Sequence, residues 1–445
     1  MLSLEVVQTK LAKYATTTIN KEFGTNINIE KLRVSLISWD TALKGVYIED
    51  YQKDTLFYIS ELKTSILSVG NLTKGKLEFG DIDVDNLNFK LKNYYGERNT
   101  NLEVFIDKLD DGKPRAPGTP PFFFSSSFVD IKQSKFQYID DNLETPETLR
   151  FENLNIQANN FQILGPEVSA DIDNMSFYSK RGLQVENLKT VFKYTKQQMR
   201  FDSLNIKTPL SSLDGNLIFN YNREDFKDFL NKVNVVADFQ ESVVALDEIN
   251  LVYNEFGKGK VATFSTNING VLNDLNTDDL FLLSDNTGIR GDFNFKNLFN
   301  KQKGFILDAK IKNVTSSYYQ LNALLPNLIG NSLPSTFSKL GQFTVRGNAL
   351  ITDSSIEAKV NLNTAVGSSY ADIVITDFNN IDNAAYKGFI SLIDFDLGDF
   401  VDSKSLGKTS LDFNVEGKGF IKEKLNTEVI GQIYSIEFNR YNYKD

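Results

Sequence analysis

The 445-residue chain contains no cysteine and no histidine. The absence of cysteine excludes disulfides, thiol nucleophiles and thiolate metal sites. The absence of histidine removes the usual general base near neutral pH and the commonest metal ligand. We therefore expect a protein that is not an enzyme and holds no metal or cofactor. Carboxylate chemistry of the kind used in glycoside hydrolysis is the remaining catalytic alternative.

The chain also lacks a long apolar run and an excess of basic residues. No stretch of about 18 apolar residues is present, so we expect no membrane-spanning helix, and the first residues do not resemble a signal peptide. The formal net charge is −10. Since nucleic acids attract basic surfaces, we expect no nucleic acid partner, and direct adsorption to anionic lipid head groups is disfavoured.

Apolar and aromatic residues are abundant, because hydrophobic residues make up 41% of the chain, with 35 Phe and 18 Tyr. This composition favours strands. The stretch 75–91, GKLEFGDIDVDNLNFKL, alternates apolar and polar residues, but the phase slips at Gly80-Asp81 and again at Asp85-Asn86. A one-residue slip moves the apolar set to the opposite face unless the backbone bends there, and Gly, Asp and Asn favour such bends. We predict a strand that bends twice and keeps one apolar side.

The same unit of apolar strand, polar corner and second strand recurs along the chain. We identify it at residues 55–67, 151–156, 171–177, 184–192, 200–206, 245–251 and 277–283. The spacing is irregular, which excludes a solenoid of short fixed period. The sequence therefore predicts a long ladder of strands that share one corner chemistry.

Other segments suggest how the ladder is divided. Residues 4–23 read as an amphipathic helix that plugs the first end of the ladder, with Gly24 as its C′ residue; its apolar stripe is Leu4, Val7, Leu11, Tyr14, Ala15 and Ile19. Four of the nine prolines lie in residues 112–121, which indicates a linker or edge excursion, with a proline-rich recognition peptide as the alternative. The predicted domains are the helix 1–24, a first β module 25–111, the linker 112–121 and a continued ladder 122–445.

A larger repeat begins near residue 210. Each copy has a strand, a short helical or lid segment and a glycine-punctuated strand pair. The closing glycines Gly270, Gly347 and Gly417 are 347−270 = 77 and 417−347 = 70 residues apart, which favours stacked modules. In the second copy Tyr318, Leu321, Leu325 and Leu328 share a helix face that Pro326 interrupts. The strand pattern continues to Asp445, so we expect the natural protein to continue beyond it.

Three local motifs resemble metal-binding or phosphate-binding loops but lack residues that such loops require. Asp81, Asp83 and Asp85 resemble the start of a calcium loop, but the sixth and twelfth positions are Asn86 and Lys92, so we interpret them as a solvated strand face. The segment 405–410, SLGKTS, has Asp402 where a phosphate loop needs glycine and leads into a strand. Residues 257–260, GKGK, fail the same test.

The predicted fold class is mostly β: an elongated, repeat-built β-groove, an arched and twisted sheet, with an N-terminal amphipathic helix and a few short lid helices. The apolar side of such a ladder must be covered either by protein or by another apolar material, because large exposed apolar patches are rare on soluble proteins. Helices are too few to cover a ladder of roughly 20 to 25 strands, which at about 4.8 Å per strand reaches roughly 100 to 120 Å.

Several segments resemble the AsmA-like superfamily, specifically the amino-terminal part of a TamB-type envelope protein. They are the stretch from Val7 to Val34 followed by LKGVYIED, LEFGDIDVDNLNFKL, GQFTVRGNALIT and SLGKTSLDFNVEGKGF. The resemblance covers essentially the whole chain through diffuse apolar patterns. It implies a periplasmic β-groove that shields phospholipid acyl chains between the inner and outer membranes. It also implies an inner-membrane anchor before Leu2 and a carboxy-terminal domain that docks on an Omp85-type outer-membrane barrel, both absent from this chain.

We therefore predict a passive lipid conduit that also supports outer-membrane protein assembly. The candidate groove-lining residues are Leu77, Phe79, Ile82, Val84, Leu87, Phe89, Leu91, Phe151, Leu154, Ile156, Phe201, Leu204, Ile206, Leu217, Phe219, Ile249, Leu251, Phe293 and Phe295. For each of them, an ordinary protein core is the competing interpretation. The alternatives for the whole chain are a structural or adhesive β-solenoid with a dry core, a carbohydrate-active β-helix, and a chaperone for nascent outer-membrane strands.

Overall fold

The computed structural model describes residues 5–35, 37–67, 76–109, 123–144, 146–300, 302–329, 335–378, 384–420 and 424–444. The chain is mostly β, as predicted, with 22 described strands. It forms two compact units, Met1–Pro209 and Leu210–Asp445. The proline-rich segment 112–121 lies outside the described residues, so its predicted role as a linker stays a prediction.

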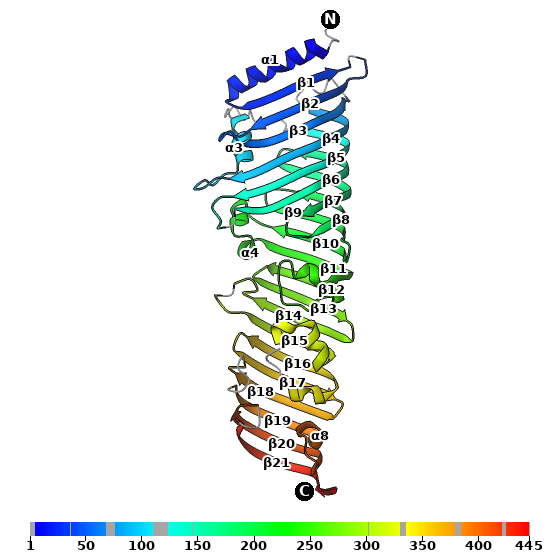
Figure 1. Cartoon of the computed structure of the whole chain (residues 1–445), viewed down its shortest axis with the longest axis vertical. Helices are drawn as coiled ribbons and strands as arrows, with labels where there is room; N and C mark the ends of the chain where they lie inside the picture. Colours follow the sequence, from blue (N-terminus) through cyan, green and yellow to red (C-terminus); the bar gives the residue numbers. More distant parts are fainter. Residues whose placement is uncertain are drawn as a thin grey trace. The chain divides into compact units, whose positions relative to one another are not determined.

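The first unit is an open sheet in which each strand pairs with the next one along the chain (Figure 1). All of these pairs are antiparallel except β4 and β5, which are parallel. Two helices accompany the sheet, α1 (Glu5–Phe23) and α3 (Asn101–Leu109). The strands are β1 (Asn26–Val34), β2 (Asp40–Glu49), β3 (Thr55–Ile66), β4 (Lys76–Asn93), β5 (Phe123–Asp140), β6 (Glu147–Leu164), β7 (Glu167–Ser179), β8 (Gln184–Tyr194) and β9 (Gln198–Lys207).

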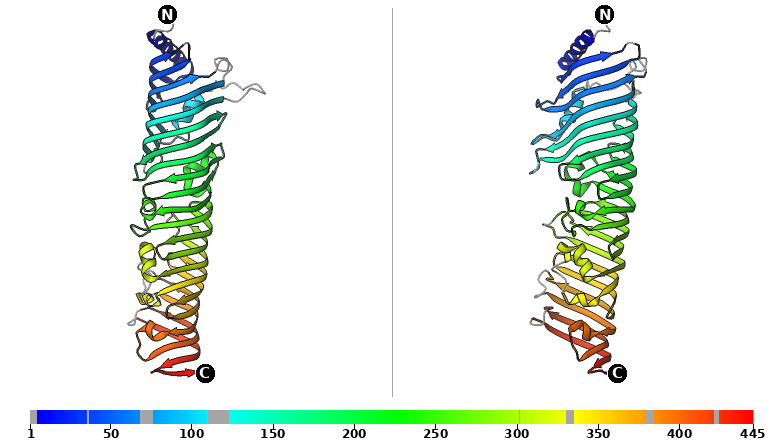
Figure 2. Two further views of the ribbon diagram at one scale, coloured as in Figure 1. Left: turned by 90° about the vertical axis from the view of Figure 1, so that its right-hand side faces the viewer. Right: turned by 45° about the vertical axis from the view of Figure 1, so that its right-hand side comes forward.

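The second unit is also an open sheet, and its described strand pairs are all antiparallel (Figure 2). Its strands are β10 (Ser212–Asn220), β11 (Asn234–Ala245), β12 (Val261–Val271), β13 (Asp274–Ser284), β14 (Thr287–Lys296), β15 (Ile306–Ser317), β16 (Gln342–Thr352), β17 (Ser355–Thr364), β18 (Gly367–Thr376), β19 (Ala385–Asp396), β20 (Leu406–Lys418), β21 (Asn426–Phe438) and β22 (Tyr441–Lys444).

Short helices connect some strands of the second unit. They are η1 (Arg223–Asp228), α4 (Phe229–Lys232), α5 (Leu246–Ile249), α6 (Tyr318–Leu324), α7 (Pro326–Ile329), η2 (Ser335–Leu340) and α8 (Leu397–Val401). The break predicted at Pro326 is confirmed, since α6 ends at Leu324 and α7 begins at the proline. Helical connections follow β10, β11, β15 and β19, and those after β11, β15 and β19 are four strands apart.

The predicted corners contain residues in the left-handed conformation, and three of the four named next are β-bulges. Asn86, Asn153, Ser203 and Asp279 have φ angles of 56°, 51°, 50° and 49° within their strands, and the pairing register shifts at Asn153, Ser203 and Asp279. A bulge of this kind adds one residue and bends the strand. It therefore returns the apolar residues to the same face after each phase slip, as the sequence predicted.

One predicted corner unit is wrong. Residues 245–251 do not continue a strand, because β11 ends at Ala245 and α5 follows at once. The Asp247-Glu248 pair that suggested a corner lies in the first turn of this helix, where carboxylates are favoured by the helix dipole.

Helix α1 lies along the outer edge of β1, as predicted for a plug (Figure 1). The predicted apolar stripe is wrong at Tyr14, Ala15 and Ile19, which are exposed, and Leu4 lies outside the described residues. Tyr14 is 74% exposed, whereas Gln8, Ala12 and Thr16 are buried. Gln8 donates from Nε2 to the Val34 carbonyl and accepts from the Val34 N–H, both at 2.8 Å. The helix therefore turns its polar side chains to the strand edge.

Candidate functional site

Apolar side chains form registered columns across the first unit. In each column, one residue of every strand pairs directly with an apolar residue of the next, so all of its members lie on one face of the sheet. All members of the longest column are buried or half-buried. They are Leu32, Leu43, Leu62, Val84, Ile131, Ile156, Met175, Leu188 and Ile206.

Stacked phenylalanines run beside this column. The ring of Phe89 lies 4.5 Å from Phe57 and 5.3 Å from Phe136, and Phe151 lies 5.8 Å from Phe136 and 4.2 Å from Phe177, centroid to centroid. Such pairs contribute about 0.5–1.5 kcal/mol each beyond area burial. The rings join β3 to β7 into one continuous aromatic surface, which we call the apolar face of unit 1 together with the column above.

The opposite face of the same strands carries charge. Glu61, next to Leu62, pairs with Lys63 at 2.9 Å and with Lys44 at 3.2 Å. The hydrogen bond from Lys63, then that from Lys44, lowers the pKa of Glu61. On β5, Lys132 pairs with Asp130 at 2.8 Å. The period-two alternation therefore separates the sheet into one apolar and one charged side.

Polar side chains form hydrogen bonds with the backbone of the bulged residues. The N–H of Gln133, a residue with φ 49°, donates to Asn155 Oδ1 at 3.0 Å. The N–H of Glu241 donates to Ser265 Oγ, and that of Asp394 to Ser410 Oγ, each at 3.0 Å. A bulged residue loses its ladder partner, so its N–H needs another acceptor. The Ser and Asn side chains stabilise the bends by replacing that partner.

The second unit repeats the columns with smaller residues. The pairs again connect one strand to the next, and many members are Ala or Gly. One column is Leu217, Ala237, Ile268, Thr277, Phe293, Ala309, Ala349, Ala358, Ile373, Gly388 and Val415. Another is Phe219, Val235, Gly270, Leu275, Phe295, Leu307, Ile351, Ile356, Ile375 and Tyr386. These columns define the apolar face of unit 2.

A polar cluster holds α3 at the margin of β2–β4. Asn101 is fully buried and donates to Asp50 Oδ2 and to the Lys90 carbonyl, each at 3.0 Å. Tyr94 donates to the same Asp50 oxygen at 2.7 Å. Burial, followed by the hydrogen bond to Asp50 and its charge, raises the pKa of the Tyr94 phenol. Asn101 Oδ1 also accepts from the Lys92 N–H at 2.8 Å, so the first residue of α3 is hydrogen-bonded both to β4 and to Asp50, and the cluster anchors α3.

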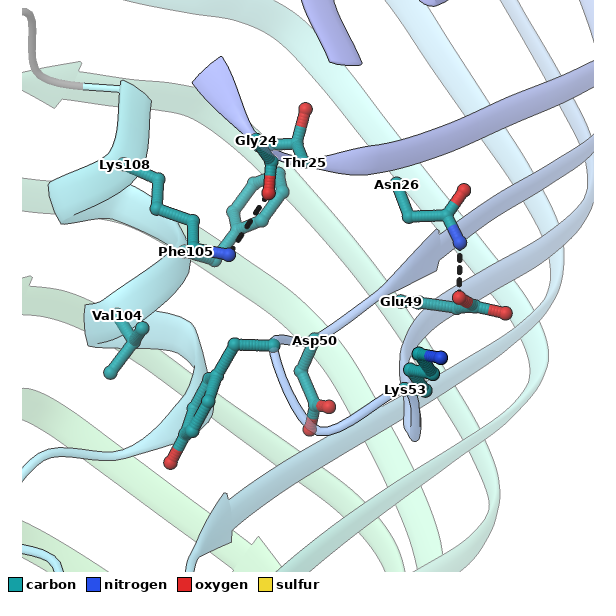
Figure 3. A pocket seen from close by; sticks show the side chains of 10 residues that line it. Gly24, Thr25, Asn26, Glu49, Asp50, Lys53, Val104, Phe105 and Lys108 are labelled. Carbon is teal, nitrogen blue, oxygen red and sulfur yellow. Dashed lines mark hydrogen bonds between the residues drawn. The ribbon is translucent and has the colours of Figure 1, made fainter. Parts of the chain in front are cut away.

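A pocket of about 200 Å³ opens beside this cluster, between α3, the α1–β1 turn and the β2–β3 turn (Figure 3). Lys108 reaches across from α3 and donates to the Gly24 carbonyl at 2.9 Å. Val104 and Phe105 supply the apolar wall, and Glu49 and Lys53 lie at the rim. The mixed charge of this lining indicates no particular ligand.

The structure places some of the predicted lining residues in the columns and most of the others in buried or half-buried positions. Val84, Ile156 and Ile206 belong to the longest column of unit 1, and Phe89 and Phe151 belong to its aromatic stack. Each of the following is buried or half-buried: Leu77, Phe79, Ile82, Leu87, Leu91, Leu154, Phe201, Leu204, Leu217, Phe219, Phe293 and Phe295.

Two predicted lining residues lie elsewhere. Ile249 ends α5 and is 37% exposed, and Leu251 follows it at 42% exposure. Both were assigned from a strand pattern that the helix replaces.

Sequence reasoning missed the register partners Phe57, Phe136, Ile131, Met175 and Leu188. Phe136, Ile131, Met175 and Leu188 alternate with polar neighbours as the chosen residues do, so the same signal was available for these four; Phe57 lies between Leu56 and Tyr58. Only the pairing shows that they continue the columns.

Two of the motifs set aside in the sequence lie in strands, and residues 257–260 lie in the connection between β11 and β12. Asp81, Asp83 and Asp85 lie in β4, and Gly407, Lys408 and Thr409 lie in β20. Over the described ranges, no group of three or more carboxylates is arranged to hold a metal ion. The described helices include none that is long and apolar enough to cross a membrane.

Comparisons with protein-family models and with curated proteins find no match to this chain.

Proposed function

We propose that the chain binds hydrocarbon chains on its apolar faces and conducts phospholipid acyl chains passively along a β-groove. The observation that carries the proposal is the unbroken column of buried and half-buried apolar residues from Leu32 to Ile206. Beyond their neighbouring strands, β5 to β9 make no extensive contact with another described element. We propose that the half-buried members of the column on these strands are open to a ligand.

The energetics of such a face suit conduction. Burial of a methylene contributes about 0.8 kcal/mol, so an acyl chain gains free energy at every position along the column. The lining varies little in polarity from strand to strand, because each contributes Leu, Ile, Val, Met or Phe. The binding energy therefore changes little as the chain slides, and movement needs no chemical step.

The bulges and the helical connections support the proposal that the sheet curves into a groove. Bulges bend strands, and those at Gln133 and Asn153 follow one another on β5 and β6, beside the left-handed residue Asn86 of β4. We propose that these bends curve the sheet around the apolar face. The helical connections after β11, β15 and β19 supply the short lids and match the spacing of the proposed 70-to-77-residue repeat.

We further propose the setting that the sequence resemblance implies, an AsmA-like protein of TamB type in the periplasm. The inner-membrane anchor and the Omp85-type partner belong to this proposal through the resemblance alone. The charged face fits an aqueous setting, because Lys and carboxylate side chains pair across it in both units.

Matched variants on adjacent residues test the proposal. Ile156 lies on the apolar face and Gln157 on the opposite face, paired with Asp130. The protein is incubated with phosphatidylethanolamine vesicles that contain an alkyne-tagged phospholipid, with a photo-crosslinker in place of Phe89. We expect strong labelling in the parent protein, a several-fold loss in Ile156→Lys, and no loss in Gln157→Lys.

Circular dichroism controls for folding of both variants, and Ile156→Asn gives a milder polar replacement. Equal labelling of Ile156→Lys and Gln157→Lys, or the absence of labelled lipid in the folded parent, would overturn the proposal. Native mass spectrometry of the protein purified in gentle detergent checks independently for bound lipid.

The edge of β21 favours a second candidate, chaperoning of extended strands. Over residues 426–434 this strand pairs with β20 on one side, and β22 covers only the following residues 435–438. Val429, Ile430 and Ile433 are 50%, 65% and 40% exposed. An exposed apolar edge accepts an added strand. Binding of a 10-residue amphipathic β-peptide that is lost on Ile430→Pro, but retained in Ile156→Lys, supports this candidate.

A further inference from the structure

The connection between β11 and β12, residues 246–260, crosses from one margin of the unit 2 sheet to the other. It leaves β11 at Ala245 and returns at Val261, which pairs with Ala245. Between these points, the ring of Tyr253 lies 5.8 Å from that of Phe299. Phe299 follows β14 at the margin where β12 ends and β13 begins, because its N–H donates to Asn273 Oδ1 at 2.7 Å. We call residues 246–260 the strap.

The strap packs on the apolar face of unit 2. Leu246 and Ala262 are buried together with Leu324 of α6. Val244 of β11 and Leu282 of β13 pack against this cluster, as does Phe256 of the strap. The strap therefore lies over Ala262 of β12 and Leu282 of β13.

Helix α6 holds the strap from the neighbouring connection. The Gly257 N–H donates to the Leu324 carbonyl at 2.9 Å, and Asn327 Nδ2 donates to the Asn254 carbonyl at 2.9 Å. A Cβ atom at residue 257 would lie 1.8 Å from the Ala323 carbonyl oxygen, so the contact requires glycine. Inside the strap, the Asn250 side chain donates to the Phe256 carbonyl and accepts from the Phe256 N–H.

The strand connections of unit 1 contain no comparable segment between β6 and β9. Residues 165–166, 180–183 and 195–197 are the whole of the three turns there, and each is too short to cross a sheet. On the proposed function, a hydrocarbon chain therefore meets two different surfaces, one between β6 and β9 that no strand connection crosses and one beneath the strap in unit 2.

We infer that the strap is a gate, and that an acyl chain occupies the apolar face of β12–β14 only when residues 246–260 lift from it. This inference depends on the proposed function. The contacts to be broken are the Tyr253–Phe299 ring pair, the Gly257–Leu324 and Asn327–Asn254 hydrogen bonds, and the packing of Phe256. The internal bonds of Asn250 and Phe256 remain, so the strap moves as one piece.

The absence of cysteine makes the gate directly testable. In a Tyr253→Cys, Phe299→Cys variant of the full chain, a short bis-maleimide ties the strap to the far margin. A photo-crosslinker replaces Leu280, which lies on the apolar face of β13 between Leu275 and Leu282, or Phe177 of unit 1 as the reference site. The probe is the same vesicle with alkyne-tagged phospholipid.

We expect the bis-maleimide to reduce lipid labelling at Leu280 at least tenfold and to leave labelling at Phe177 unchanged. Tyr253→Ala combined with Phe299→Ala, without the bis-maleimide, raises labelling at Leu280. Labelling at both sites that is unaffected by the tie overturns the gate and leaves the proposed function intact. No labelling at either site in the folded, untied protein overturns both. Mono-maleimide treatment controls for modification of the thiols.

Discussion

Single asparagine and serine residues at the strand bends determine where a strand of the sheet changes direction. Asn153 has a φ of 51° in the middle of β6. This left-handed conformation is tolerated by Gly, Asn and Asp and opposed by β-branched side chains. The bend at this position therefore depends on the residue type and on little else, since the side chain of Asn153 is exposed.

Replacement of Asn153 tests this dependence. We expect Asn153→Val to lower the free energy of unfolding by about 1–3 kcal/mol, because it forces a β-branched residue into a left-handed conformation. Asn153→Gly keeps the conformation accessible and has a much smaller effect. Asn361→Val on β17 is the control, because Asn361 is exposed and its φ is not positive. Urea denaturation provides the measurement, and equal effects of the two valine variants would contradict the prediction.

The Tyr94 phenol provides a pH-dependent test of the cluster that anchors α3. Its pKa is raised in the folded protein above the value of about 10 expected in the unfolded chain. The folded state keeps the proton that the unfolded chain loses, so the stabilisation is complete below about pH 10 and is lost as the pH rises further. We expect the difference in unfolding free energy between the parent and Tyr94→Phe to stay constant from pH 7 to 9 and to narrow above pH 10.

Denaturation of both proteins at a series of pH values measures this difference. Subtracting the unfolding free energy of Tyr94→Phe from that of the parent removes the effects of lysine titration, because both proteins contain the same lysines. A difference that stays constant to pH 11 would show that the phenol does not keep its proton in the folded state.

Helix α1 demonstrates that an element can be predicted correctly while its packing is not. Besides Gln8, Asn20 donates from Nδ2 to the Ile27 carbonyl and accepts from the Ile27 N–H, both at 2.8 Å. Thr9 contacts the Leu32 backbone in the same way. These side chains replace the hydrogen bonds of a missing neighbouring strand, so they protect an edge that would otherwise accept another chain.

Removal of this edge protection is expected to cause self-association. In the double variant Gln8→Ala, Asn20→Ala the backbone of β1 loses four hydrogen bonds, and β1 edges of different molecules become free to pair. We expect concentration-dependent oligomers in sedimentation velocity experiments. Tyr14→Ala, at a residue that is 74% exposed on the same helix, serves as the control and is expected to remain monomeric. Monomeric behaviour of the double variant would contradict this account of α1.

Across each unit, the apolar columns and the charged face contribute differently to stability. The ion pairs are exposed, and exposed pairs are weak and screened by salt. The columns are partly removed from water, and hydrophobic stabilisation does not depend on screening. The adjacent residues Glu61 and Leu62 lie on the charged and the apolar face, respectively. Substitutions at these two positions therefore compare the contributions of the two faces to stability.

Substitutions at these two residues are expected to respond differently to salt. Glu61→Gln lowers the thermal midpoint slightly in low salt, and the loss disappears in 1 M NaCl. Leu62→Ala costs about 2 kcal/mol, and this loss is retained in 1 M NaCl. Calorimetry at both salt concentrations makes the measurement. A salt-sensitive loss at Leu62 would show that the columns are not the main source of stability.

The sequence by itself determined the mostly β class, the extent of α1, the corners at Asn86 and Asn153, and most of the residues on the apolar faces. All of these follow from local rules, namely a side-chain period of two and the backbone preferences of Gly, Asp and Asn. The tertiary structure alone decided the register that aligns Val84 with Ile131 and Ile156, the parallel pairing of β4 and β5, the polar face that α1 turns to β1, and the path of residues 246–260. The alternation of apolar and polar residues along a strand is the same whichever strand lies beside it, so it does not determine the register. The hydropathy of a strand also does not reveal that its edge is unpaired. The register, the parallel pair, the packing of α1 and the path of residues 246–260 therefore depend on partners that are distant in the sequence.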